Sequence, residues 1–230
     1  MKSNFIHVVF VVDESGSMMS SQSDVIGGFK RVINEQRAVK EGTCSVSLFK
    51  FADEVTEVYR GKDVNDVEYL DEKTYAPGGL TAMNDGIGVA IDRIGKWLND
   101  MKESERPEKN LIVIMTDGCE NASKEYTGER IREMIKHQEE KYNWTFMYLG
   151  TDITDAKAAV NLGIKYRGFS ARKDVTSNYL AVNTVLSEYR TISGGTELKA
   201  SAMAKKIDDT LLAMNTTYEA ETGAKIENNE

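Results

Sequence analysis

Short apolar runs recur along the chain and predict buried β-strands. Residues 5–12 read FIHVVFVV and residues 111–115 read LIVIM. Uniformly apolar runs of this length are typical of strands that are covered on both faces of a sheet. Further strands are predicted at residues 45–51, 55–59, 144–149 and 165–169. The first two of these flank a short polar turn at residues 52–54, so we expect them to form a hairpin.

Between the strands, apolar residues recur at spacings of three and four, which predicts amphipathic helices. The longest pattern runs from Met83 to Met101 and follows a turn signal, PGG, at residues 77–79. Helices are predicted at residues 25–36, 83–101, 125–141, 155–162 and 175–192. This order of strands and helices favours an α/β fold, a doubly wound and mostly parallel six-stranded sheet. One edge strand is expected to be antiparallel, with helices on both faces.

The glycine pair Gly194-Gly195 interrupts the helical pattern and predicts a boundary. Residues 1–194 are expected to form the α/β domain. Residues 195–230 are expected to form a helical extension, with apolar residues spaced for one helix face between 200 and 214, and then a polar, acidic tail.

Charge and cysteine content narrow the classes of function. The 29 basic and 37 acidic residues give a net charge of −8, which argues against nucleic acid as a partner because phosphate binding needs clustered Lys and Arg. Cys44 and Cys119 match neither a metal finger nor a redox motif, so we expect two free thiols. The apolar run at residues 5–12 is too short for a signal peptide or a membrane span. A cytoplasmic protein without a membrane partner is therefore expected.

Polar residues with oxygen side chains follow the predicted strands at three places. Asp13, Ser15 and Ser17 follow the first strand, Asp117 follows the strand at 111–115, and Thr81 precedes the long helix. In open α/β sheets, ligands bind beyond the carboxyl ends of the strands, where such loops meet. Two carboxylates and three hydroxyls are hard oxygen donors, which suit Mg²⁺, with Mn²⁺ and Ca²⁺ as alternatives.

Three short segments resemble the metal-ion-dependent adhesion site of von Willebrand factor A domains. DESGS at residues 13–17 is similar to the family's Asp-x-Ser-x-Ser signature, GGLT at 78–81 to its threonine loop, and MTDG at 115–118 to its aspartate loop. The three segments occur in the family's order, and the resemblance covers roughly residues 4–192. It is closest to the intracellular type found in bacteria and phages.

The resemblance implies a role for each of the five residues. Ser15 and Ser17 would bind a divalent metal directly, and Thr81, Asp13 and Asp117 would bind it directly or through water. One coordination position would stay open for an Asp or Glu of a protein partner, so the implied function is binding without catalysis. Relatives of this type work beside an ATPase or a stress-response system, which implies such a partner here.

Two other functions are left open by the residues themselves. A metal-dependent hydrolase or phosphatase would use the same metal, but the three loops contain no His, Lys or Arg, and no phosphate-binding glycine motif is present. A scaffold with a purely structural metal is the other alternative. Beside the site, Glu14 and Glu120 are interpreted as surface charges, Asn121 as a turn residue and Cys119 as a packed small side chain.

Overall fold

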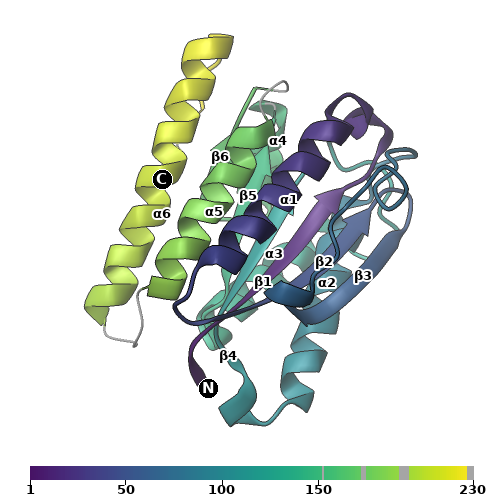
Figure 1. Ribbon diagram of the computed structural model, residues 1–230. Coiled ribbons are helices and arrows are strands. Elements are labelled where there is room, and N and C mark those ends of the chain that lie inside the picture. Colours follow the sequence, from purple (N-terminus) through teal and green to yellow (C-terminus); the bar gives the residue numbers. More distant parts are fainter. Residues whose placement is uncertain (152, 172–174, 192–196, 227–230) are drawn as a thin grey trace.

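The chain forms one six-stranded sheet with helices on both faces in a computed structural model (Figure 1). The structure describes residues 1–151, 153–171, 175–191 and 197–226. The strands are β1 (Lys2–Asp13), β2 (Thr43–Phe51), β3 (Val55–Asp63), β4 (Pro107–Met115), β5 (Thr145–Gly150) and β6 (Tyr166–Phe169). The helices are α1 (Gln22–Ala38), α2 (Met83–Asp100), α3 (Gly128–Tyr142), α4 (Ile153–Asn161), α5 (Val175–Thr191) and α6 (Glu197–Thr222). Short 3-10 segments are η1 (Gly16–Ser21), η2 (Val64–Asp66) and η3 (Glu103–Glu105).

The strand order confirms the predicted topology. The sheet runs β3-β2-β1-β4-β5-β6, and every neighbouring pair is parallel except β2 and β3. The predicted hairpin therefore supplies the one antiparallel strand, at the edge of the sheet. The chain moves from β1 to β2 on one side and later returns to β4 on the other side of β1. Strand order thus reverses between β1 and β4, which is where ligands bind in open α/β sheets.

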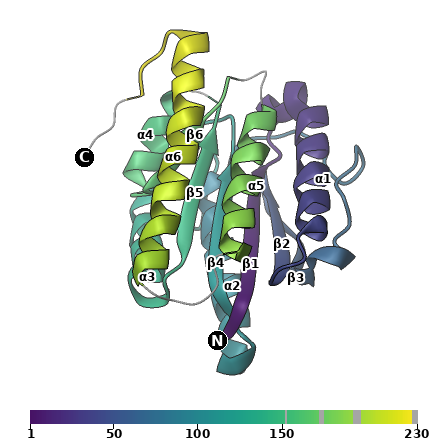
Figure 2. The same cartoon turned by 60° about the vertical axis from the view of Figure 1, so that its left-hand side comes forward.

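The central strand β1 is buried on both faces because its residues alternate between two apolar cores. Val8 and Phe10 belong to the core under α1, α5 and α6, whereas Val9 and Val11 belong to the core under α2, α3 and α4. Figure 2 shows the same two layers of helices on either side of the sheet. Burial on both faces explains why the sequence of β1 is apolar without a polar-apolar alternation.

The third helix begins later than predicted, at Gly128 instead of residue 125. Asp85, near the start of α2, accepts hydrogen bonds from the backbone N–H groups of Lys124, Glu125 and Tyr126. These three residues are therefore held outside the helix, and Thr127 Oγ1 caps it by accepting from the N–H of Arg130 at 3.2 Å.

The C-terminal helix α6 lies along the outer edge of the sheet, beside β6 and α5 (Figure 1). It is longer than the predicted helical segment of 200–214, but its expected apolar face is buried. Close packing is possible because Gly168 of β6 has no side chain, since a methyl carbon there would lie 2.8 Å from Leu211 Cδ2. The predicted boundary at 194/195 lies outside the described residues. Among the described residues, we find no helix with the length and apolarity needed to cross a bilayer.

Candidate metal-binding site

The parallel pairing of β1 with β4 brings the first and third loops together. Val12 is in register with Met115, so the residues that follow each of them, Asp13 and Thr116, lie side by side. Thr116 Oγ1 donates a hydrogen bond to Asp13 Oδ2 at 2.5 Å. The contact joins two residues that are 103 positions apart in the sequence, at the point where strand order reverses.

Within the first loop, a chain of short contacts orients the oxygen donors. Asp13 Oδ1 accepts from the backbone N–H of Ser15 at 2.7 Å, which bends the loop after β1. The Oγ atoms of Ser15 and Ser17 are hydrogen bonded at 3.1 Å. Ser17 Oγ then donates to Asp117 Oδ1 at 2.5 Å. The alternate residues of the loop thus aim their oxygens at one region.

Thr81 reaches the same region from the loop before α2. A methyl carbon placed on Gly118 would lie 3.3 Å from Ser17 Oγ, 3.4 Å from Thr81 Oγ1 and 3.8 Å from Asp13 Oδ2. Oxygens from all three loops therefore surround the space that Gly118 leaves free. All five predicted site residues are brought together at the carboxyl end of the sheet.

Burial raises the free-energy cost of keeping the carboxylates of the site charged. Asp13, Ser15, Thr81 and Asp117 are buried, and Ser17 is exposed. Burial raises the pKa of Asp13 from 3.8 to about 6, and the nearby charge of Asp117 also raises it, although the hydrogen bonds from Thr116 and Ser15 act in the opposite direction. Two carboxylates held close together out of water are costly unless a cation neutralises them.

The residues present fit a small divalent cation. A hollow of about 300 Å³ opens above the donors, and its lining includes Ser15, Ser17, Thr81 and Asp117. Among the described residues, we find no cluster of three or more His, Cys, Asp or Glu side chains that could hold a metal ion. The cluster described here has only two carboxylates, and its other donors are hydroxyls. Such all-oxygen donor sets suit Mg²⁺, Mn²⁺ and Ca²⁺.

Glu14 and Glu120 are not surface charges, and the interpretation made from the sequence was wrong for both. Glu14 Oε1 accepts from Lys50 Nζ at 2.8 Å and from the N–H of Ala76 at 2.7 Å, which ties the loop before the Gly-Gly pair to β1. Glu120 Oε2 accepts at 2.8 Å from the N–H of Asn84, in the first turn of α2. A carboxylate at a helix N-terminus is favoured by the helix dipole and fixes where the helix begins.

Asn121 is more than a turn residue, because it clamps the threonine loop. The N–H of Thr81 donates to Asn121 Oδ1 at 2.8 Å, and the N–H of Asn121 donates to the carbonyl of Thr81 at 3.0 Å. Sequence reasoning missed this role, and its one signal was the position of Asn121 four residues after Asp117. Cys119 also differs from expectation, because its thiol is free but exposed and lines the hollow instead of packing in the core.

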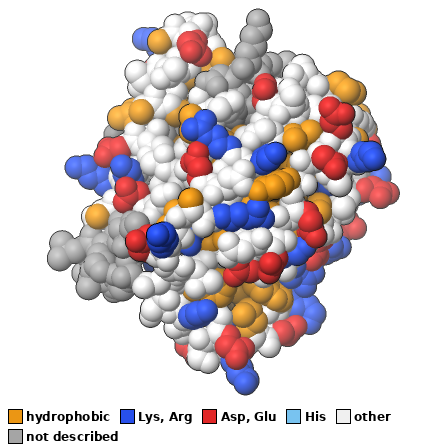
Figure 3. All heavy atoms as spheres, in the orientation of Figure 1, with side chains coloured by type: hydrophobic (Ala, Val, Ile, Leu, Met, Phe, Trp, Pro, Cys, Tyr) orange, Lys and Arg blue, Asp and Glu red, His pale blue; other side chains and the backbone are white. Residues whose placement is uncertain are grey.

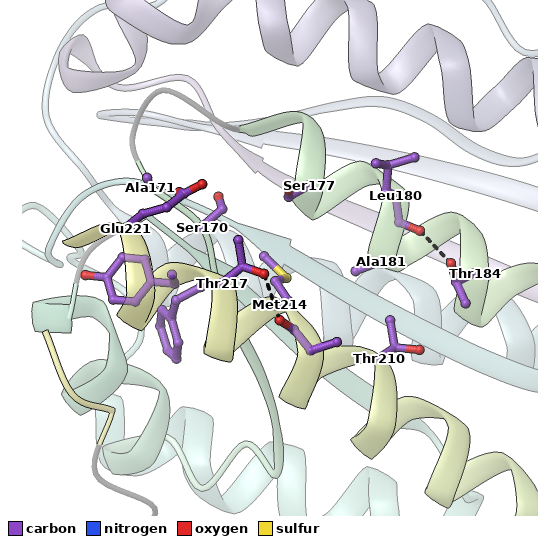
Figure 4. Close-up of a pocket in the computed structure, with 13 residues that line it drawn as sticks. Ser170, Ala171, Ser177, Leu180, Ala181, Thr184, Thr210, Met214, Thr217 and Glu221 are labelled. Atoms are coloured by element: carbon purple, nitrogen blue, oxygen red, sulfur yellow. Dashed lines mark hydrogen bonds between the residues drawn. The ribbon is translucent and has the colours of Figure 1, made fainter. Parts of the chain in front are cut away.

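A hollow between two of the helices lacks this chemistry. A hollow of about 250 Å³ lies between α5 and α6, and its side chains are drawn in Figure 4. Its hydroxyls on Thr184 and Thr217 donate back to the carbonyls of Leu180 and Ala213 of their own helices. It shares no lining residue with the hollow above the oxygen donors, and Glu221 is the one carboxylate among its lining residues. The site at the end of β1 and β4, where oxygen donors from three loops meet at an open hollow, is the candidate functional site.

Comparison with known proteins supports the same fold. SpaC, a pilus adhesin from Lactobacillus rhamnosus GG, superposes with a TM-score of 0.61 at 16% identity, covering 82% of this chain and 30% of that one. The vWF domain of the type V pili tip protein Mfa5 from Porphyromonas gingivalis gives 0.57 at 11% identity, covering 80% of this chain and 95% of that one. Proximal thread matrix protein 1 from the mussel byssus, solved with a zinc-occupied MIDAS motif, gives 0.53 at 16% identity.

The chain covers 46% of that mussel protein, which covers 80% of this chain in return. At these identities the structures show the fold alone. The sequence profile of the von Willebrand factor type A domain matches residues 7–167, which is more than half of the chain. The match spans all three loops of the site, from β1 to β6. The chain therefore belongs to the von Willebrand factor type A domain family.

Proposed function

We propose that this protein is a metal-dependent protein-binding module. A divalent cation, Mg²⁺ in the first place and Mn²⁺ or Ca²⁺ as alternatives, would be held by Asp13, Ser15, Ser17, Thr81 and Asp117. An Asp or Glu of a partner protein would complete its coordination through the hollow above the site. Domains of this family are adhesion and protein-interaction modules, and the mussel relative has a metal in the corresponding motif.

The observation that carries the proposal is the convergence of oxygen donors around an open hollow. Asp13 and Asp117 are buried and close enough for the charge of one to raise the pKa of the other. A bound cation would supply positive charge that both neutralises this pair and attracts a carboxylate from outside. Ser17 is the exposed donor and faces the direction from which a partner would approach.

The site residues would contribute to binding because hydrogen bonds hold their side chains in fixed orientations. The hydrogen bond from Ser17 Oγ to Asp117 Oδ1 fixes both side chains, and the bond from Thr116 fixes Asp13. Groups fixed before a ligand arrives lose less conformational entropy when they bind it. The hydroxyl and carboxylate oxygens are thus preorganised, and no chemical step is required of them.

A hydrolase or phosphatase is the less favoured alternative. Among the described residues that line the hollow, none is His, Lys or Arg. A phosphoryl-transfer site needs cationic or N–H donors for the phosphate oxygens and a base for the nucleophile. Asp117 is the one carboxyl side chain among the described residues of that lining, and it already accepts a hydrogen bond from Ser17 Oγ. We propose binding because a partner carboxylate needs only the metal.

We propose that the domain extends over residues 1–194 and that residues 195–230 form a C-terminal extension packed on it through α6. We also propose a protein partner and not nucleic acid. The net charge is −8, and acidic and basic side chains are interspersed on the face formed by α1, α5 and α6 (Figure 3). Nucleic-acid binding usually depends on a basic stripe or patch.

The test is a metal titration followed by thermal unfolding. Wild-type protein is stripped with chelator and melted at rising Mg²⁺ or Mn²⁺ concentrations. A metal at 100 times its Kd stabilises the folded state by about 2.7 kcal/mol, which raises the Tm of a domain of this size by about 5–10 °C. We expect this shift in wild type and its loss in Asp13→Ala.

Asp209→Ala is the matched control, because Asp209 is exposed on α6 and outside the hollow. It should keep the full metal-dependent shift. Equal shifts in Asp13→Ala and wild type would contradict the assignment of the site. The structural-metal scaffold would be favoured by a different result. In that case the metal would raise the Tm of wild type but not of Asp13→Ala, and the binding of carboxylate ligands to wild type would not depend on the metal.

A further inference from the structure

An exposed leucine stands at the mouth of the candidate metal site. Leu80 is 54% exposed and lines the hollow together with Ser17, Thr81 and Asp117. More than half of this large apolar side chain is therefore in water, directly beside the polar donors. Large apolar groups left in water next to a binding site are typical of surfaces that a partner covers.

The backbone that carries Leu80 is firmly held. Its N–H donates to Asp53 Oδ2 at 3.2 Å, and the carbonyl of the preceding residue, Gly79, accepts from the N–H of Gly16 at 3.1 Å. The following residue, Thr81, is fixed by its two bonds to Asn121. Leu80 is thus presented in a defined position, which reduces the entropy lost when a partner packs on it.

The other two loops also carry an exposed apolar or weakly polar side chain, two residues after an oxygen donor in each case. Met19, two residues after Ser17 in η1, is 61% exposed. Cys119, two residues after Asp117, is exposed and lines the hollow. Each of the three loops that supply oxygen donors therefore also supplies one exposed, weakly polar side chain.

Charge around the hollow disfavours a strongly acidic partner. The loop segments 14–21, 76–82 and 116–123 contain no Lys or Arg. Lys50, a basic side chain that contacts the first of them, is paired with Glu14. Asp117 lines the hollow, with Asp13 buried behind it. One incoming carboxylate would meet the metal, but further acidic groups on the partner would find no Lys or Arg in these three segments to pair with.

We infer that the partner presents one Asp or Glu flanked by an aliphatic or aromatic residue that packs on Leu80, within a segment that is otherwise neutral or basic. The inference rests on the proposed function and names the chemistry of the partner for that same site. Leu80 is then a specificity-determining residue, since the metal selects for the carboxylate and the leucine selects for its neighbour.

A peptide library tests the inference. Seven-residue peptides with Asp fixed at the centre and six random flanking positions are displayed on phage, bound to immobilised protein in Mg²⁺ and eluted with EDTA. We expect EDTA-eluted peptides from wild type to be enriched in aliphatic or aromatic residues beside the Asp and depleted in further acidic residues. The best synthetic peptide should bind Leu80→Ser at least about fivefold more weakly than wild type.

Two variants separate the possible failures. Leu212→Ser is the matched control, because Leu212 is 62% exposed on α6, which contributes nothing to the lining of the hollow. It should bind the peptide as wild type does, and Asp13→Ala should not bind it. EDTA-sensitive binding without apolar enrichment, or unchanged by Leu80→Ser, would overturn the inference and leave the proposed function standing. Absence of any EDTA-sensitive binding would count against both.

Discussion

His7 is buried in the sheet with its ring nitrogens between two hydroxyls. Its side chain is fully inaccessible, with Nδ1 2.7 Å from Ser45 Oγ and Nε2 3.1 Å from Ser47 Oγ. Its ring also lies 5.0 Å from that of Trp97. Burial lowers the pKa of His7 from 6.5 to about 3, although a hydrogen bond with Ser45 acts in the opposite direction. The folded protein therefore keeps this imidazole neutral where the unfolded chain would protonate it.

The direction and size of the effect follow from linkage. Because the pKa of His7 is lower in the folded state, its contribution to stability is present above pH 6.5 and is lost as the pH falls toward 3. At about pH 4.5 the loss is roughly 2–3 kcal/mol, since each pH unit below the unfolded pKa costs about 1.36 kcal/mol. For a protein of ordinary stability this is a large fraction of the free energy of unfolding.

The assay is urea unfolding of wild type and His7→Gln at pH 7.5 and at pH 4.5. Glutamine keeps a polar group opposite the serines but has no proton to gain. Between pH 7.5 and pH 4.5, the free energy of unfolding of wild type should fall by about 2–3 kcal/mol more than that of the variant. The titration of carboxylates such as Asp13 affects both proteins equally and cancels in this difference. NMR can follow His7 directly, because His137 is the only other histidine. Equal losses in the two proteins, or imidazole shifts of His7 that titrate near pH 6.5, would refute the reasoning.

Two substitutions probe the metal site from its supporting residues. In Gly118→Ala the new carbon would lie 3.3 Å from Ser17 Oγ and 3.4 Å from Thr81 Oγ1. We expect the Mg²⁺ affinity, measured by calorimetry, to fall at least about tenfold, with little change in the Tm of the metal-free protein. An unchanged affinity would show that the oxygen donors do not face the space beside Gly118. In Asn121→Ala the buried N–H of Thr81 loses its acceptor, so metal-free stability should fall by about 1–3 kcal/mol and Mg²⁺ affinity with it. Asn121→Asp retains an acceptor and should recover most of the affinity, whereas failure of that rescue would contradict the clamp.

The strands and the convergence of the five candidate residues could be predicted because their signals are local. An apolar run such as residues 5–12 has to be buried on both faces, and a run of oxygen side chains directly after it lies at the carboxyl end of the strand. Parallel pairing then brings Asp13 close to the residues that follow β4. The sequence pattern alone was enough to place these loops at one edge of the sheet.

The roles of Glu14, Glu120 and Asn121 could not be predicted from local patterns. Each binds backbone groups that lie 36 to 62 positions away in the sequence, so their function exists only once the loops have met. A polar residue in a loop looks the same in the sequence whether its partner is water or a distant N–H. The start of α3 at Gly128 was missed for the same reason, because Asp85 of α2 sets it.

The side chain of Asn215 on α6 imitates the peptide group of a seventh strand. Its Oδ1 accepts from the N–H of Phe169 at 2.9 Å, and its Nδ2 donates to the carbonyl of Arg167 at 3.1 Å. These are outward-facing backbone groups of β6, the strand at this edge of the sheet. An open edge is a template on which other chains can add strands and aggregate. By occupying two of its pairing positions and covering the strand with a helix, α6 ends the sheet on this side, so neighbouring molecules cannot extend it there.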